Sequence, residues 1–363
     1  MTSSQAQIEA VSQRLESFVA TQRSPWADAE AGVFLAAAAS ALSGGKRLRA
    51  RFCLTGWQAV AGRPPGASES PTPSDEVVGA AAALEIFHAA ALVHDDLIDN
   101  SDTRRGRPAA HRELQSAHTA AGWSGDSAGF GRSAAVLLGD LLVSFSDDLL
   151  EESLTGTEHA ASARAVYALM RREVTIGQFL DIAEEAAFVT APDDEHAGRA
   201  LRVASLKSAR YSVQHPLLLG ASLAGADATQ SDTLARFGHP LGLAFQLRDD
   251  VLGVFGDASV TGKPSGDDLR EGKRTLLVAY ARERLAPGAR RVMDELIGDP
   301  DLTDDQIAAL QQTIIDTGAL ERVEEQIAAF ADEADRALRG APLATPAVGE
   351  LRDLARAATA RVA

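Results

Sequence analysis

The chain has 363 residues, 45% of them hydrophobic, which is enough for a sizeable buried core in one large domain or in two. Its 51 acidic and 35 basic residues give a net charge of −16, which argues against a protein that binds nucleic acid or an anionic membrane through a basic face. The single cysteine, Cys53, excludes an intramolecular disulfide and a cysteine-rich metal site, and it favours a cytoplasmic protein. Aromatic residues make up 5% of the chain and few windows alternate with period two, so an all-β fold is excluded.

Helical periodicity runs through nearly the whole chain. Helices are expected at Gln5–Thr21, Asp28–Leu42, Arg47–Ala61, Val77–Asp99, Ser133–Thr155, Glu158–Glu185, Gly198–Ala224, Asp232–Gly256 and Lys273–Leu285, then near Thr303–Thr317 and Leu320–Leu338, before a last short amphipathic stretch. Loops rich in Gly, Pro or Ser are expected at Gly62–Asp75, Ala120–Gly131 and Gly256–Asp268, with Ser74 or Asp75 capping the following helix. Because neither a linker nor a repeat divides the chain, we expect a single all-α domain over residues 1–363.

The longest apolar stretch, Val77–Ile98, is long enough to raise the question of a membrane span. It also carries Glu85, two histidines and two aspartates, and charge at that density would be very costly inside a bilayer. We therefore expect a helix buried in a soluble protein, without stable insertion into a membrane. The polar N-terminal residues also lack the basic and apolar regions of a signal peptide.

Two acidic clusters end apolar helices. Asp95 and Asp99 are four residues apart, so their carboxylates project from one face of a helix, and a pair of this kind suits a hard divalent cation such as Mg²⁺. Asp249 and Asp250 form a second cluster within an apolar helix. A solvated acidic helix end would explain a single cluster. Two clusters in apolar surroundings favour a shared metal cage, because unpaired buried carboxylates are expensive.

The basic residues concentrate in three short segments next to glycines, where arginine side chains are well placed to bind phosphate oxygens. These segments are Gly44–Arg51, Thr103–Arg107 and Arg270–Arg274, with Lys263 nearby. Arg47, Arg51 and Arg107 are interpreted as ordinary surface ion pairs. Of the histidines, His88 lies two turns before Asp95 and is placed to reach a bound anion, whereas His94 is assigned to local packing, and Cys53 to the core.

Six motifs in order resemble those of the trans-isoprenyl diphosphate synthases, or polyprenyl synthetases, and among these the geranylgeranyl diphosphate synthases. The motifs are GGKRLR, HDDLID with TRRGRP, GQFLD, LKSA, FQLRDD, and GKPSGDD with GKR. The resemblance covers about residues 30–290, with C-terminal helices over 300–363 beyond it. It implies the isoprenoid synthase type of fold, which is a single large helical bundle around a central cavity.

The resemblance also implies a role for each matching residue. Metal and catalytic roles fall on the aspartates of the two motifs, with Asp181 and Asp267 as supporting carboxylates. The implied metal and catalytic residues are Asp95, Asp96, Asp99, Asp249, Asp250, Asp181, Asp267 and Lys207. Lys46, Arg49, His88 and Arg105 resemble the isopentenyl diphosphate site. Contacts to the allylic diphosphate are implied for Arg104, Lys207, Ser208, Gln246, Lys263 and Lys273.

The implied reaction needs two to three Mg²⁺ ions. They and the basic side chains stabilise the departing diphosphate, the double bond of isopentenyl diphosphate attacks the allylic cation, and a proton leaves, so no protein nucleophile is needed. The chain departs from the family pattern at Gly253, where the second motif has its third aspartate. Asp257 and Asp267 are candidates to compensate. Ser208 stands where Thr is common.

Product length is predicted from the first motif. Ala91 and Ala90 lie four and five residues before Asp95, and these small side chains leave room for a chain that bulky aromatics would block. Phe87, one turn further, is either a floor near twenty carbons or simply part of the core, and a facing helix or a dimer partner are alternative floors. Geranylgeranyl diphosphate is therefore favoured, with farnesyl and longer polyprenyl diphosphates as alternatives.

Three other classes compete with a chain-elongating prenyltransferase. A non-catalytic partner subunit of a heteromeric synthase is expected to lose aspartates that this chain keeps. A class I terpene cyclase does not need GGKRLR with TRRGRP. An acidic helical scaffold leaves the buried carboxylates unexplained. A homodimer follows from the resemblance alone.

Overall fold

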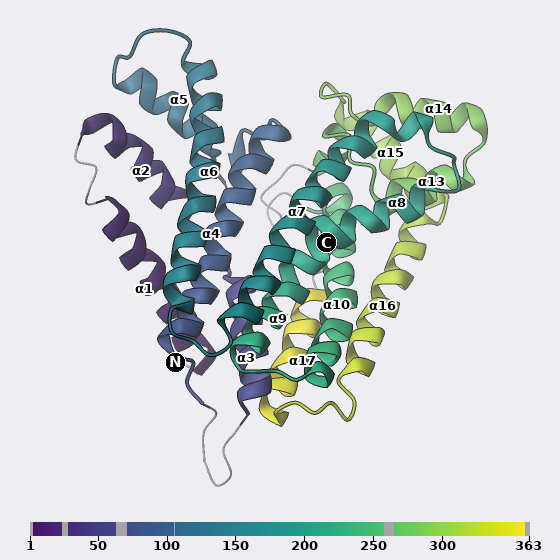
Figure 1. The fold of residues 1–363 in the computed structure, drawn as a ribbon. Coiled ribbons are helices and arrows are strands. Elements are labelled where there is room, and N and C mark those ends of the chain that lie inside the picture. The colour runs from purple at the N-terminus through teal and green to yellow at the C-terminus, as the bar shows by residue number, and fades with distance from the viewer. Residues whose placement is uncertain (1–2, 24–27, 63–70, 105, 258–264, 360–363) are drawn as a thin grey trace. The chain divides into compact units, whose positions relative to one another are not determined.

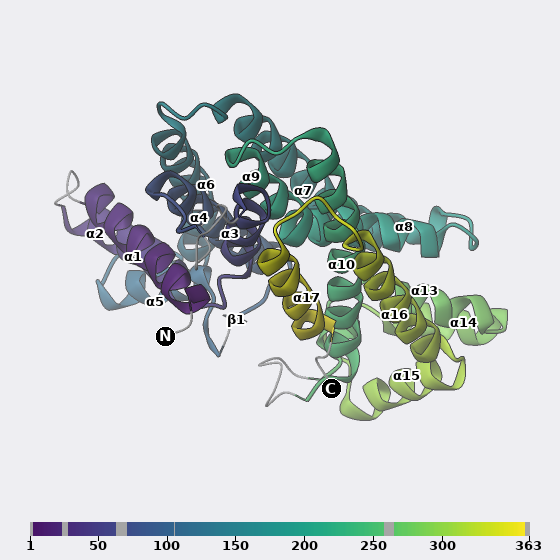
Figure 2. The ribbon, with the colours of Figure 1, turned by 90° about the horizontal axis from the view of Figure 1, so that it is seen from below.

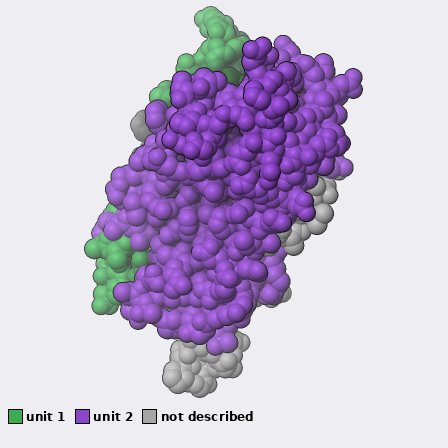
Figure 3. Space-filling view, turned by 90° about the vertical axis from the view of Figure 1, so that its right-hand side faces the viewer, with its two compact units in different colours: residues 1–163, 220–225 green, residues 164–219, 226–363 purple. Residues whose placement is uncertain are grey.

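The computed structural model describes residues 3–23, 28–62, 71–104, 106–257 and 265–359. Within these ranges the chain is almost entirely helical, and the only sheet pairs the two-residue strands β1 (Thr103–Arg104) and β2 (Arg107–Pro108) (Figure 1). Contacts divide it into two compact units, distinguished in Figure 3. Unit 1 comprises residues 1–163 and 220–225, and unit 2 comprises residues 164–219 and 226–363. The single domain expected over the whole chain stays a prediction.

Unit 1 is built around one long apolar helix. Its complete helices are α1 (Ser3–Arg23), α2 (Ala29–Ala41), α3 (Leu48–Ala61), α4 (Asp75–Ile98), α5 (Ala110–Ala120) and α6 (Ser127–Leu154). Helix α4 lies beside α6, as both ribbon views show (Figures 1 and 2). Four consecutive buried alanines, Ala80–Ala83, and Gly79 against Ser153 permit the close approach. The Ser146 hydroxyl donates to the Ala83 carbonyl at 2.6 Å.

The apolar character of α4 is explained by its position in this unit. The helix is long and apolar enough to cross a membrane by length and composition, but 78% of its most apolar window is buried against protein. The expected buried helix over Val77–Asp99 is therefore present. Ser74 has the N-cap conformation, yet its side chain makes no capping bond to the backbone. Its hydroxyl instead hydrogen-bonds the Glu76 carboxylate and lowers the pKa of that group.

Two parts of unit 1 differ from the sequence-based expectation. Helix α5 was not expected, because its sequence AHRELQSAHTA is polar except at Leu114 and its alanines. The second half of the expected loop Ala120–Gly131 is helical, because α6 begins at Ser127 with Asp126 as its cap. Gly131 is required inside this helix, since any side chain there would meet the His111 carbonyl of α5.

Unit 2 surrounds a second long helix. Its elements are α7 (Ala160–Ala187, its first turn in unit 1), η1 (Phe188–Thr190), α8 (His196–Val203), η2 (Ala204–Gln214), α9 (His215–Leu223, its end in unit 1), α10 (Ala228–Phe255), α12 (Asp267–Arg270), α13 (Leu276–Arg284), α14 (Pro287–Leu296), α15 (Asp304–Asp316), α16 (Ala319–Ala337) and α17 (Thr345–Thr359). Helix α10 packs against η2, and it also packs against α16 and α17, which lie beside it in Figure 2. Asp227 and Gln230 form a capping box that fixes the start of α10. Helices α12 and α14 were not expected from the sequence.

The expected helix Gly198–Ala224 is not a single regular helix. Its middle, η2, is an eleven-residue π-helix between α8 and α9. Two glycines of neighbouring helices touch it: a side chain at Gly177 of α7 would meet the Lys207 backbone, and one at Gly242 of α10 would meet the Ala209 carbonyl. The π-helix is therefore held between two helices that approach its backbone directly. Such segments are rare and often lie at functional sites.

Candidate functional site

The first acidic cluster lies at the C-terminal end of α4 in unit 1. Asp99 is the C-cap residue, and its amide donates to the Asp95 carbonyl at 2.8 Å, so the two residues are one turn apart. The Asp95 side chain is 21% exposed and that of Asp96 is 5% exposed. The negative end of a helix dipole disfavours carboxylates. This cluster therefore requires positive partners.

Arg104 of β1 supplies one positive partner. Its Nε donates to the Asp96 carboxylate at 2.7 Å, and its Nη2 also bonds Asp96 and lies 3.5 Å from Asp95. Burial acts to lower the pKa of Arg104, but the hydrogen bond and charge of Asp96, with Asp95 and Asp99, outweigh burial and raise that pKa. Asp96 is thus charge-compensated by the protein. Arg105, the next expected ligand, lies outside the described residues.

The cationic segment before α3 also has an unfavourable charge for its position. Lys46 is exposed in the loop and Arg49 is half-buried in the first turn of α3, where the helix dipole is positive. An anion bound at this end would reverse the penalty, since free amides and cations there both favour phosphate. His88 is half-buried on α4. The structure places Lys46, Arg49 and His88 in the same unit.

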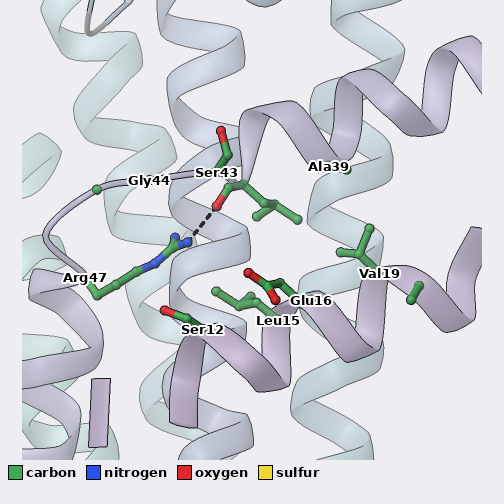
Figure 4. A pocket seen from close by; sticks show the side chains of 11 residues that line it. Ser12, Leu15, Glu16, Val19, Ala39, Ser43, Gly44 and Arg47 are labelled. Carbon is green, nitrogen blue, oxygen red and sulfur yellow. Dashed lines mark hydrogen bonds between the residues drawn. The ribbon is translucent and has the colours of Figure 1, made fainter. Parts of the chain in front are cut away.

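Arg47 does not behave as the expected surface ion pair. Its side chain is only 12% exposed, and its guanidinium donates to the Leu42 carbonyl at 2.7 Å (Figure 4). Its Nη1 lies 3.8 Å from Oε2 of the buried Glu85. Arg47 therefore does take part in an ion pair, but the prediction that this pair lies at the surface was wrong, because its partner is a buried glutamate of α4. Arg107, in contrast, is exposed and bonds the hydroxyls of Ser43 and Ser40.

Two cavities flank this loop within unit 1. One of about 360 Å³ lies between α1, α2 and the loop, with Glu16 and Arg47 in its lining (Figure 4). The other, about 270 Å³, is lined by Gly44 from the loop, by Asp96 at the end of α4 and by Arg104. The second cavity therefore joins the glycine loop to the acidic cluster.

The residues expected to control product length all lie on α4. Phe87 and Ala90 are buried in the core of unit 1, whereas Ala91 is half-buried one turn before Asp95. Small side chains therefore do precede the acidic cluster on the structured helix. The role of these positions stays a prediction.

The second acidic cluster lies on the last turns of α10 in unit 2. Asp249 is half-buried, and Asp250 is buried and accepts a hydrogen bond from the Gln246 amide at 2.7 Å. Burial, followed by the charge of Asp268, raises the pKa of Asp250 to about 8. Asp250 therefore holds a proton near neutral pH until a positive charge arrives.

Asp268 was not singled out in the sequence, yet it fills the place left by the missing third aspartate. A side chain at Gly253 would overlap the Asp268 carboxylate, and Lys273 Nζ lies 3.4 Å from Asp268 Oδ1. Asp267, the expected outer partner, is half-buried in the first turn of α12. The doubled aspartate in GKPSGDD was the available signal, and only the fold distinguishes its two members. Lys263 lies outside the described residues, and Asp257 is exposed.

Lys207 and Asp181 form an ion pair between η2 and α7. The contact of Gly177 with the Lys207 backbone brings the two elements together. Ser208, which follows Lys207, and Gln178, which lies three residues before Asp181, are both half-buried. Asp181, an expected metal ligand, is thus compensated by an expected phosphate ligand.

The chemistry of the donors suits Mg²⁺. Among the described residues, no three carboxylates, imidazoles or thiolates converge closely enough to hold an ion unaided. Mg²⁺ characteristically takes one or two carboxylates together with water and substrate phosphates, so paired aspartates are an adequate protein contribution. Cys53 is completely buried, which confirms that it belongs to the core, and burial raises the pKa of its thiol to about 12.

Similarity to known proteins extends over most of the chain. The polyprenyl synthetase family model matches residues 33–314. A geranylfarnesyl diphosphate synthase from Aeropyrum pernix is 31% identical over 315 residues, covering 86% of this chain and 88% of that protein. A geranylgeranyl diphosphate synthase from Mycobacterium tuberculosis is 39% identical over 203 residues, 55% of this chain and 51% of that protein. A crystal structure of geranylgeranyl pyrophosphate synthase from Corynebacterium glutamicum, complexed with isoprenyl diphosphate and magnesium, has a TM-score of 0.89 and 39% identity over 98% of each chain.

Proposed function

Because the chain belongs to the polyprenyl synthetase family, we propose that it condenses isopentenyl diphosphate head to tail with allylic diphosphates and makes geranylgeranyl diphosphate. The prenyltransferase class and the all-α isoprenoid synthase fold follow from the family match and from the similar structures. Relatives are named for geranylgeranyl, geranylfarnesyl and farnesyl products. The product of this chain therefore has to be argued from its own residues.

The observation that carries the proposal is the reversed placement of charge in unit 1. Aspartates crowd the negative end of α4, and Lys46 and Arg49 lie at the positive end of α3. Both placements cost stability in the free protein. Both become favourable when a metal–diphosphate binds the aspartates and a second diphosphate binds the cations. Two diphosphate substrates are what a chain-elongating condensation requires.

In the proposed reaction the protein binds and orients two substrates and excludes water. Asp95, Asp99 and Asp249 hold two to three Mg²⁺ ions, which, when bound, neutralise charge that develops on the leaving diphosphate. Arg104 and Lys207 bind the allylic diphosphate, while Lys46, Arg49, His88 and Arg105 bind isopentenyl diphosphate. The remaining contacts to the allylic diphosphate come from Ser208, Gln246, Lys263 and Lys273. The released diphosphate accepts the proton, so the protein needs no base.

The small side chains before Asp95 support a product longer than farnesyl diphosphate. Ala90 and Ala91 are small side chains about one turn before Asp95 on α4, and Phe87 lies one turn further from the aspartates. We propose that Phe87 is the floor that stops growth near twenty carbons. A farnesyl or longer-chain synthase is the alternative, and the same assay separates them.

We further propose a cytoplasmic homodimer. Two neighbouring apolar residues of α6, Val136 and Leu137, are exposed, the latter by 61%. Exposed apolar side chains of this size favour contact with a partner. A non-catalytic role in a heteromeric synthase is less favoured, because Asp95, Asp96 and Asp99 are all present.

The test is a product assay. Purified protein is incubated with Mg²⁺, isopentenyl diphosphate and, in turn, dimethylallyl, geranyl or farnesyl diphosphate, and the products are sized by mass spectrometry. We expect a discrete geranylgeranyl product that disappears in Asp95→Ala and lengthens in Phe87→Ala. Farnesyl diphosphate as the sole product would overturn the argument from the alanines, and no elongation from any primer would favour the partner-subunit alternative.

A further inference from the structure

A buried carboxylate of α4 is not used by the proposed mechanism. Glu85 is 4% exposed and lies three residues before His88, hence one turn away on the same face of the helix. Its Oε1 accepts a hydrogen bond from the Ala50 amide at 3.0 Å, and its Oε2 lies 3.8 Å from Arg47 Nη1. Both partners belong to the junction between the glycine loop and α3. Glu85 therefore joins this junction to α4.

The contact with Ala50 replaces a missing helix cap. Arg47 has the N-cap position of α3 but makes no capping bond with its own side chain. The first amides of a helix need acceptors, and the Glu85 carboxylate supplies one from another helix. Its negative charge also suits the positive end of the helix dipole.

The contact with Arg47 holds a strained backbone. Arg47 has φ 49° and ψ 44°, a left-handed backbone conformation that residues other than glycine rarely adopt, and Gly44 and Gly45 before it also have positive φ. The Arg47 guanidinium bonds the Leu42 carbonyl as well (Figure 4). Strain of this kind persists only where the surroundings fix it, and it is often found at functional sites.

Lys46 and Arg49 stand on either side of this fixed point, and His88 stands one turn beyond Glu85. We propose that Glu85 is a positioning residue for the isopentenyl diphosphate site, because it holds the loop that carries Lys46 and Arg49 in register with the helix that carries His88. The inference rests on the proposed function for the role of those three ligands. A buried charge and a left-handed arginine are both expensive, and an apolar residue at position 85 would be cheaper for stability alone.

The experiment compares Michaelis constants for the two substrates in Glu85→Gln. Glutamine keeps the size of the side chain and an oxygen for the Ala50 amide, but it removes the charge that faces Arg47. We expect KM for isopentenyl diphosphate to rise about tenfold, equivalent to about 1.4 kcal/mol. KM for the allylic primer and kcat at saturation are expected to stay within about twofold, because the aspartate cluster is untouched.

Two further variants separate positioning from folding. Arg47→Gln is expected to raise KM for isopentenyl diphosphate similarly, and the double variant is expected to be no worse than either single one, since both remove one interaction. Glu85→Asp keeps the charge on a shorter side chain, so we expect an intermediate KM. Glu152→Gln, which breaks an ion pair with Arg14 in the same unit, is the control and is expected to change neither KM.

Equal increases of both Michaelis constants, or a fall in kcat alone, would overturn the inference. If thermal unfolding shows that Glu85→Gln does not fold, Arg47→Gln and Glu85→Asp decide the question. They do so by the same criterion, a higher KM for isopentenyl diphosphate with an unchanged KM for the allylic primer. Wild-type protein that elongates no primer would instead contradict the proposed function. An active wild type with an unchanged KM in the variants contradicts the inference alone.

Discussion

The two adjacent-aspartate pairs, Asp95-Asp96 in unit 1 and Asp249-Asp250 in unit 2, look equivalent in sequence but are compensated differently. Asp96 is buried against the Arg104 guanidinium, whereas Asp250 is buried against the neutral amide of Gln246. The pKa of Asp250 is raised to about 8 by burial and by Asp268, while Asp96 raises the pKa of its arginine partner. The same motif thus provides a paired carboxylate in one unit and a protonated one in the other.

The difference teaches that an aspartate motif does not determine its own charge. The charge state follows from the partner that the fold supplies, because a buried carboxylate either finds a cation or keeps its proton. In unit 1 that partner comes from a short β-hairpin. In unit 2, Lys273 is shared between Asp268 and Glu271, and its charge does not outweigh burial at Asp250.

The largest expected effect tests whether the less buried aspartate of each pair, Asp95 or Asp249, has the same role. Asp95→Asn and Asp249→Asn are each expected to lower kcat by about 10³-fold, because each removes charge that acts on the leaving diphosphate. Asp148→Asn, at an exposed acid of α6, is the control and is expected to leave kcat unchanged. A loss confined to one of the two variants would show that only one unit contributes a metal ligand.

The second expectation concerns stability and sharpens the contrast between Asp96 and Asp250. At pH 7, Asp96→Asn is expected to lower the free energy of unfolding by about 2 kcal/mol, because it weakens a charged hydrogen bond to Arg104. Asp250→Asn is expected to raise it instead, because the wild-type carboxyl is ionised in the unfolded chain at pH 7 and must take up a proton to become buried.

The contrast should also depend on pH. Since the folded pKa of Asp250 lies above that of the unfolded chain, the wild type loses stability as pH rises from about 4 to about 8, and the loss is complete above that range. At pH 9, Asp250→Asn is therefore expected to be more stable than the wild type. Urea unfolding at both pH values measures this, and equal effects of the two variants at pH 7 would contradict it.

A third expectation concerns Gly253. Gly253→Ala is expected to lower stability by about 1 kcal/mol, at the low end for overpacking, because the added methyl meets the movable end of the Asp268 side chain. The cost should vanish in Gly253→Ala combined with Asp268→Ala. Gly253→Asp, which restores the third aspartate of the family motif, should lower stability more than Gly253→Ala does. If Gly253→Asp instead raised activity while Asp268 is intact, Asp268 would not occupy the place of the third aspartate.

The smallest expected effect is an acid sensitivity of unit 2. Burial lowers the pKa of His196, His215 and His239, and a nearby arginine adds to the shift at each of them. Each of these histidines therefore takes up a proton less readily when folded, so stability falls as pH drops below about 6.5, where the unfolded chain takes up protons. Hydrogen exchange of α8 to α10, corrected for intrinsic rates, should be faster at pH 5.5 than at pH 7.5, and equal protection at both would contradict this.

Much of the fold was predictable from the sequence because helical periodicity is a strong signal in long segments. The expected helix Val77–Asp99 matches α4 within two residues, and the expected Asp232–Gly256 matches α10 within four. Helices α5 and α14 were missed, because each buries only a few side chains. The family and its reaction class were also predictable, since six motifs occur in order.

The parts of the site that escaped prediction depend on tertiary contacts. Nothing local distinguishes Asp268 from Asp267, and only the approach of α12 to Gly253 does so. The burial of Arg47 depends on a left-handed backbone and on Glu85, 38 residues further along the chain (47 to 85). Spacing rules describe one helix at a time, so they cannot show which charges meet across helices.

The π-helix η2 has a consequence for how the chain tolerates insertions and deletions. A π-helical turn holds more residues than an α-helical turn, so it rotates every following side chain of the continuous run from α8 to α9 relative to a regular helix. Lys207 faces Asp181 in this altered register. Removal of a residue of η2 before Lys207 would therefore turn the Lys207 side chain relative to Asp181. The number of residues in η2 is therefore constrained by the Lys207–Asp181 ion pair, just as the identity of these two residues is.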